Sequence, residues 1–311
     1  MSSPIVKLGI AQFGPVYQDL RASLEKLESL ISTATRQHIQ VLVFGECWLS
    51  GYPAWLDHCP EAAFWDHPPV KKAFARMYKN SITVPGKETR LIGSWAKKYG
   101  ITLLLGVNER VETGIGNGSL YNTLLTFIAD GTLANHHRKL RPTYTERLVH
   151  SPGDGQGLKA VQTAPGRIGG LICWEHWMPL SRMAMHLSGE HIHAALWPTV
   201  HEMHQVASRS YAFEGRCFVA SAGQLMQARE IPDGLTLPEL SAPTDYLMKG
   251  GSCIIGPDGS YLAEPLFEQE GFITADIDLD RVLEERMNLD TAGHYNRYDV
   301  FNLEINRERK Q

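Results

Sequence analysis

The feature that most constrains this 311-residue chain is the alternation of short apolar runs with amphipathic segments. The run VLVF at 41–44 is continuously apolar, which is typical of a strand covered on both faces. The segment before it, 19–36, has leucines and an isoleucine at helical spacing, which predicts an amphipathic helix. Repeated along the chain, this alternation predicts a layered α/β fold.

Further strands and helices follow the same pattern. Strands are expected at 6–13, 101–108, 119–128, 167–173, 192–197 and 217–222, with a last one from Phe272, and helices at 69–80, 88–99, 180–187 and 201–215. The DG at 130–131 and the PDG at 257–259 predict hairpins. Hairpins beside parallel units indicate mixed sheets. No composition shift marks a linker, so we expect one domain over 1–311 with a short C-terminal extension, and the Pro- and acid-rich 224–249 as a lid or binding loop.

Composition excludes several classes of function. The chain is 43% hydrophobic and 21% charged with a net charge of −4, so no basic excess indicates nucleic acid as a partner. No apolar run has the length of a membrane span, and the N-terminus lacks a secretory pattern. Five scattered cysteines favour free thiols in a reducing compartment, and the cytoplasm is the default expectation.

Cys173 ends the apolar strand 167–173 and begins the segment CWEHW. Most free cysteines are small buried hydrophobes, and Cys217 and Cys253, which lie within apolar strands, fit that description. Cys173 instead lies at a strand's carboxyl end, where open α/β sheets place their ligands. A thiolate there is a strong nucleophile that needs only a nearby base.

Two further segments supply candidate partners for this thiol. Glu46 directly follows the strand 41–44, and its apolar and aromatic neighbours predict a semi-buried carboxylate with a raised pKa, as a general base requires. Lys139 closes a strand within HHRKLRPTYTER at 136–147. A segment rich in Lys and Arg is often a solvated loop. This segment also contains Pro142, Tyr144 and Glu146, so it does not look like a simple polybasic patch.

Together these segments resemble the nitrilase superfamily of carbon–nitrogen hydrolases, whose triad of Glu, Lys and Cys would be Glu46, Lys139 and Cys173. GYP after Glu46, LGVNER at 105–110, SLYNTLL at 119–125 and GHY at 293–295 extend the likeness over nearly the whole chain. CWEH and RPTYTER are similar to the true nitrilase branch, in which Glu146 would be a second catalytic glutamate that positions the lysine and substrate. Gly45 stands where many relatives have Pro.

The resemblance implies a four-layer α-β-β-α sandwich with two mixed β-sheets. It also implies a homodimer or higher homo-oligomer, although the short tail leaves the assembly open. The activity it implies is hydrolysis of an organic nitrile to a carboxylic acid and ammonia through a cysteine thioimidate and thioester, with no metal or organic cofactor. Tyr52, Trp174 and Trp197 flank strand ends and would form an apolar wall for the substrate. Trp177 fits the core equally well.

Other functions fit the sequence less well than this one. HEMH at 201–204 has its second histidine one position too early for a zinc protease, and HIH at 191–193 has no third ligand, so structural or pocket roles are favoured. An amidase or carbamoylase with the same triad is the nearest alternative. A non-catalytic binding subunit on this fold is the farther one. Glu175 fits either a first-turn helix acid or the site itself.

Overall fold

The computed structural model describes residues 5–237 and 242–309. Its first sheet has six strands in the order β13–β1–β2–β3–β4–β5. They are β1 (Ile5–Gln12), β2 (Val41–Val43), β3 (Thr102–Arg110), β4 (Leu120–Phe127), β5 (Leu133–Arg138) and β13 (Gly271–Asp278). β1, β2 and β3 run parallel, whereas β13, β4 and β5 pair antiparallel with their neighbours. The sheet is therefore mixed, as the hairpin signals predict.

The second sheet has seven strands in the order β10–β11–β9–β8–β7–β6, with β12 also paired to β11. They are β6 (Val161–Thr163), β7 (Gly166–Ile172), β8 (Ile192–Leu196), β9 (Phe218–Ala222), β10 (Leu225–Gln227), β11 (Tyr246–Ile255) and β12 (Tyr261–Phe267). β7, β8 and β9 are parallel. Each sheet thus has a central parallel unit flanked by antiparallel strands.

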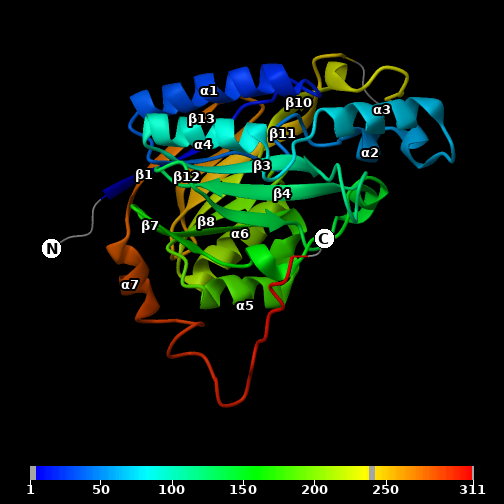
Figure 1. The fold of residues 1–311 in the computed structure, drawn as a ribbon. Helices are drawn as coiled ribbons and strands as arrows, with labels where there is room; N and C mark the ends of the chain where they lie inside the picture. Colours follow the sequence, from blue (N-terminus) through cyan, green and yellow to red (C-terminus); the bar gives the residue numbers. More distant parts are fainter. Residues whose placement is uncertain (1–4, 238–241, 310–311) are drawn as a thin grey trace.

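Helices cover the outer faces of the two sheets (Figure 1). α1 (Leu20–Arg36) and α4 (Lys87–Tyr99) lie over the first sheet, and α5 (Pro179–Leu187) and α6 (Glu202–Gly215) lie over the second. The remaining helices, α2 (Trp55–His58), α3 (Pro68–Lys79) and α7 (Asp280–Arg286), lie at the margins. The predicted four-layer α-β-β-α fold is confirmed. None of the helices in the described ranges combines the length and apolarity needed to span a bilayer.

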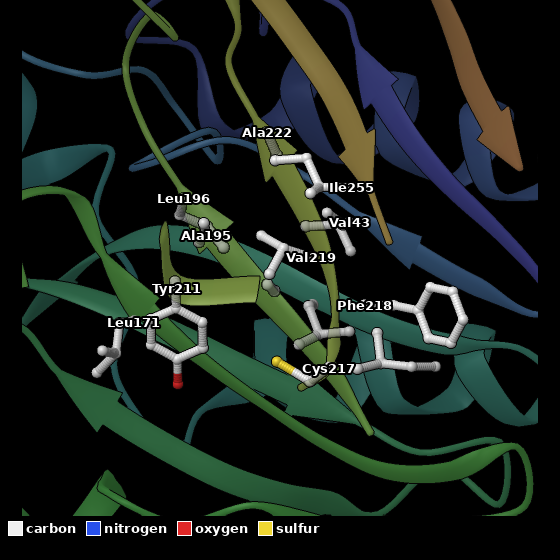
Figure 2. Close-up of a cluster of buried hydrophobic side chains, with 14 of the residues drawn as sticks. Val43, Leu171, Ala195, Leu196, Tyr211, Cys217, Phe218, Val219, Ala222 and Ile255 are labelled. Carbon is white, nitrogen blue, oxygen red and sulfur yellow. The ribbon is translucent and has the colours of Figure 1, made fainter. Parts of the chain in front are cut away.

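Apolar side chains from both sheets and from α6 form the core. Figure 2 shows part of it, with Val43 of the first sheet beside Val219 and Ile255 of the second, and Tyr211 of α6 below Leu196 in this view. A glycine of β7 makes this packing possible. A side chain at Gly170 would collide with Leu124 of the facing sheet. The strand that carries Cys173 is thus fitted closely between the layers.

The helix at 19–36 shows how the local sequence sets an element boundary. The Asp19 carboxylate accepts a hydrogen bond from the Ala22 backbone N–H at 3.0 Å and caps the first turn. Leu27 and Ile31 then bury one face of α1 against the sheet. Several elements were not predicted, including the short helices α2 and α7. The short β6 has too few residues for a periodic signal, and β10 with the start of β11 lies inside the segment expected to be a loop, of which 238–241 fall outside the described residues.

Candidate active site

Three strand ends bring the predicted residues together. Glu46 follows β2, Lys139 follows β5, and Cys173 follows β7 of the opposite sheet. Glu146 comes from the one-turn helix η2 (Tyr144–Leu148). Carboxylate oxygens of Glu46 and Glu146 and the Cys173 sulfur all lie within 4.8 Å of one another. The two sheets thus meet at a cluster of one thiol, two carboxylates and one ammonium.

Lys139 lies at the centre of this cluster. Its Nζ donates to Glu46 Oε1 at 2.8 Å and to both carboxylate oxygens of Glu146 at 2.8 Å. The side chains of all three residues are at most 1% exposed. Burial alone would lower the pKa of Lys139, but the surrounding anionic groups raise it well above its ordinary value. The lysine is therefore a fixed cation and cannot serve as the base.

Glu46 is held on one side only. Its Oε1 accepts from Lys139 and, at 2.6 Å, from Asn122 Nδ2 of β4, whereas Oε2 has no hydrogen-bond partner among the described residues. Burial raises the pKa of Glu46 to about 7, against the opposing effect of Lys139. A carboxylate with a pKa near neutrality and one free oxygen has the properties of a general base.

Glu146 is held on both sides. Besides Lys139, its Oε1 accepts from the Tyr52 hydroxyl at 3.0 Å and its Oε2 from the Thr143 backbone N–H at 3.1 Å. Burial would raise the pKa of Glu146, but Lys139, the nearby His150 and the hydrogen bond from Thr143 lower it below its ordinary value. The two carboxylates therefore have different tasks, because their environments push their pKa values apart. Glu146 stays ionised beside the lysine, and Glu46 is free to take up and release a proton.

Cys173 lies on a sharp turn between β7 and the one-turn helix η4 (Cys173–Trp177). Its φ of 53° is in the left-handed region, which non-glycine residues rarely adopt. Burial, reinforced by Glu46, raises the pKa of the thiol well above its ordinary value, while the Trp174 backbone N–H donates to the sulfur and opposes this rise. The resting thiol is thus neutral and needs a base to become a nucleophile.

Glu175 joins two of these strand ends. Its Oε1 accepts from the backbone N–H of Leu140, next to Lys139, and its Oε2 from that of Ile172, next to Cys173, both at 2.7 Å. His137 Nε2 lies 2.9 Å from Oε2. Burial would raise the pKa of this carboxyl, but His137 and the backbone donors lower it. Glu175 is thus an ionised clamp between the sheets, which resolves the two interpretations left open by the sequence.

A cavity of about 300 Å³ opens above the cluster, and Cys173, Glu146, Tyr52 and Trp174 are among its lining residues. It shares Asp57, His58, Thr145 and Leu247 with an adjoining cavity of about 610 Å³, so a substrate can extend outward. Leu247 belongs to the segment expected to be a binding loop.

The three aromatic residues predicted to line the pocket occupy different positions. Trp174 is 55% exposed and lies on the cavity wall. Tyr52 also lines the cavity and in addition holds Glu146. Trp197 is fully buried and is not among the lining residues. Its indole stacks on His204, which does line the cavity, with ring centroids 4.3 Å apart. Any effect of Trp197 on substrate would therefore pass through His204.

The cluster also contains side chains of the types that bind metal ions. Over 5–237 and 242–309, Glu46, Glu146 and Cys173 form the one group with metal-ligand spacing. Lys139 Nζ already lies against both carboxylates, and its charge disfavours a second cation there. The arrangement instead suits attack by sulfur on an electrophilic carbon whose neighbouring atom becomes negative beside the ammonium.

Comparison with known proteins identifies the family. A sequence profile described as carbon-nitrogen hydrolase matches residues 7–286. The chain belongs to the carbon–nitrogen hydrolase family. Within it, the chain is 38% identical to an aliphatic nitrilase of Sinorhizobium fredii, covering 98% of this chain and 96% of that protein. It is 35% identical to an arylacetonitrilase of Aspergillus niger, with 99% and 91% covered.

Solved structures share the fold at lower sequence identity. A carbon-nitrogen hydrolase from Helicobacter pylori G27 superposes with a TM-score of 0.73 at 19% identity, covering 96% of this chain and 97% of that one. The NitFhit protein of C. elegans superposes with a TM-score of 0.72 at 18% identity, covering 100% and 69%. These likenesses concern the fold alone.

Proposed function

We propose that this protein is a nitrilase, which hydrolyses an organic nitrile to a carboxylic acid and ammonia, with Glu46, Lys139, Cys173 and Glu146 as its catalytic residues. The observation that carries the proposal is the Cys173 thiol beside one carboxylate that can exchange a proton and a buried ammonium ion that cannot. The nitrilases that the chain resembles over nearly its full length support the choice of a nitrile as substrate.

The first step forms a covalent bond to the substrate. Glu46 takes the proton of Cys173, and the thiolate attacks the nitrile carbon. Negative charge develops on nitrogen, where the Lys139 ammonium and the Trp174 backbone N–H stabilise it. The proton held by Glu46 passes to this nitrogen, which gives a neutral thioimidate. One proton shared between Glu46 and Cys173 is sufficient for the step.

Two molecules of water complete the reaction. Glu46, again ionised, takes a proton from the first water as its oxygen adds to the thioimidate carbon. Glu46 passes this proton to nitrogen, which gives a tetrahedral intermediate with one hydroxyl and one amino group. As the carbon–nitrogen bond breaks, the hydroxyl proton is transferred to nitrogen, ammonia leaves, and a thioester remains on Cys173. The second water attacks the thioester in the same manner and releases the acid and the free thiol. Glu146 and Asn122 take no proton, because their task is to hold Lys139 and Glu46.

The proposal is tested with a matched substrate panel. The purified protein is offered aliphatic, aromatic and arylacetonitrile substrates and the corresponding amides, and ammonia and acid are measured. We expect equal amounts of both products from at least one nitrile, with Cys173→Ala inactive. Turnover of amides without nitriles would establish the amidase alternative. A wild-type protein inert toward both would favour the binding-subunit alternative.

We further infer that the chain forms a homodimer or higher homo-oligomer and works in a reducing compartment such as the cytoplasm. Leu180, Met203, Val206 and Phe213 on α5 and α6 expose apolar side chains on one outer layer, which supports self-association there. All five cysteines are free and buried, which supports the reducing compartment. Sedimentation of the wild type against Val206→Glu tests the first inference. A monomeric wild type would contradict it.

A further inference from the structure

A line of buried polar groups runs from α6 to the backbone of the nucleophile. The Tyr211 hydroxyl donates to Glu190 Oε2 at 2.5 Å, and Glu190 Oε1 lies 2.8 Å from His193 Nδ1. His193 Nε2 lies 3.0 Å from His176 Nε2, and His176 Nδ1 lies 2.7 Å from the Cys173 carbonyl oxygen. The four side chains are at most 2% exposed. No step of the proposed reaction uses them.

The direction of these hydrogen bonds follows from their last acceptor. A carbonyl oxygen can only accept, so His176 Nδ1 carries the proton and its Nε2, in the neutral ring, accepts from His193 Nε2–H. His193 Nδ1 then accepts in turn, and Glu190 must donate to it as a carboxylic acid. The titration properties agree with this uncharged state. Burial raises the pKa of Glu190 to about 7, lowers that of His176 to about 3, and lowers that of His193 well below its ordinary value.

The end of this chain is the peptide unit that joins Cys173 to Trp174. Its carbonyl oxygen accepts from His176, and its N–H donates to the Cys173 sulfur. A hydrogen bond at the oxygen of an amide strengthens the N–H of the same amide as a donor, and it also fixes the plane of the group. The line from Tyr211 therefore ends on the N–H that faces the reacting sulfur.

We propose that Glu190, His193 and His176 are positioning residues, which orient and polarise the Cys173–Trp174 peptide so that its N–H stabilises the thiolate and the negative nitrogen. The proposal rests on the proposed nitrilase function for its kinetic consequence, but not for its effect on the thiol. The three residues touch neither substrate nor the reacting atoms.

The packing around the line supports a dedicated role. A side chain at Gly169 of β7 would collide with the Glu190 carboxyl, so this strand position leaves space for it. The His193 ring stacks on Tyr211 with centroids 3.8 Å apart, and His176 stacks on Trp197 with centroids 4.8 Å apart. Each ring is thus fixed in the plane that its hydrogen bonds require.

The test compares variants that break the line with one that preserves it. Glu190→Gln keeps both bonds, because an amide N–H₂ donates to His193 and its oxygen accepts from Tyr211. Glu190→Leu removes both, and His193→Phe keeps the ring stack but removes both nitrogens. Ser208→Ala is the packing control, because it loses a buried hydrogen bond to Ser221 at 3.0 Å outside the line. Circular dichroism and Tm establish that each variant folds.

Two readouts are measured, the rate of Cys173 alkylation by iodoacetamide as a function of pH, followed by peptide mass spectrometry, and kcat and KM for a nitrile. We expect Glu190→Leu and His193→Phe to slow alkylation and lower kcat by roughly tenfold, with KM within about twofold, since they weaken rather than remove an oxyanion donor. The apparent pKa of the thiol should rise in both. Glu190→Gln and Ser208→Ala should match the wild type in both readouts.

Three results would overturn the proposal. If Glu190→Leu and His193→Phe both kept the wild-type alkylation rate and kcat, the line of hydrogen bonds would have no effect on Cys173. An equal loss in Ser208→Ala would assign the effect to packing. If Glu190→Gln lowered the alkylation rate and kcat as much as Glu190→Leu, an uncharged hydrogen-bond donor at this position would not be sufficient for the effect. Where Glu190→Leu fails to fold, His193→Phe carries the test. Alkylation needs no substrate, so an inactive wild type leaves this test intact.

Discussion

Replacing Glu46 by Gln is expected to abolish turnover and at the same time stabilise the fold at alkaline pH. Both donors to this carboxylate, Lys139 Nζ and Asn122 Nδ2, bond to Oε1, and Oε2 has no partner within the described part of the chain. A glutamine can therefore place its oxygen at Oε1 and keep both bonds. What the substitution removes is the ionisable group.

The magnitude follows from the pKa of Glu46, which burial raises from 4.5 to about 7. A folded-state pKa above the unfolded one means that the folded protein holds the proton more tightly. The contribution of Glu46 to the free energy of unfolding is complete below pH 4.5 and is lost as the pH rises through 7. A shift of this size corresponds to about 3 kcal/mol, most of it lost between pH 5 and pH 8. The glutamine variant has no such loss.

The assay is a thermal unfolding series from pH 5 to pH 8 on the wild type, Glu46→Gln and Glu146→Gln. The Tm difference between Glu46→Gln and wild type should move in favour of the variant by roughly 5 °C across the series. Glu146→Gln should behave oppositely. The lowered pKa of Glu146 means that its contribution is present above its unfolded pKa and is lost as the pH falls through the folded one, so its removal costs most at pH 8. Parallel Tm profiles for wild type and Glu46→Gln would refute the assigned protonation.

Two further predictions concern kinetics. Tyr52→Phe removes the hydroxyl that donates to Glu146 at 3.0 Å, so we expect kcat to fall by about tenfold with KM nearly unchanged, and a rise in KM alone would instead assign Tyr52 to substrate binding. In the wild type, kcat/KM should fall by about tenfold per pH unit below the Glu46 pKa of about 7. At such pH values Glu46 is already protonated and cannot take the proton of Cys173. A flat profile down to pH 5 would contradict the role of Glu46 as base.

The sequence alone predicts the layers and the positions of the reacting groups. Glu46 and Cys173 each follow an apolar run, so their strand ends are visible from the hydrophobic pattern, whereas Lys139 closes a strand that the DG turn at 130–131 indicates. The pattern also predicts α1, because Asp19 caps a long periodic stripe. Short elements such as β6 have too few residues for a period to register.

The supporting contacts were not predicted, because they depend on which strands become neighbours. Asn122 lies in the middle of β4 with no local signal of function, yet it holds Glu46 from a different strand. Glu175 joins backbone groups of two sheets, a contact that no sequence spacing reveals. Trp197 and Trp174 each lie at a strand end, so the sequence does not distinguish them. The packing does, because Trp197 lies behind His204 and Trp174 lies on the cavity wall.

The central claim is that Cys173 forms the covalent intermediate of nitrile hydrolysis. The most direct test mixes the protein with an excess of a turned-over nitrile, quenches with acid within the first turnovers, and measures the mass of the peptide that carries Cys173. We predict that this peptide gains the mass of the thioimidate or acyl group, that the gain is absent in Cys173→Ala, and that it disappears as substrate is exhausted. Steady turnover with an unmodified Cys173 peptide, or turnover by Cys173→Ala at the wild-type rate, would contradict the claim.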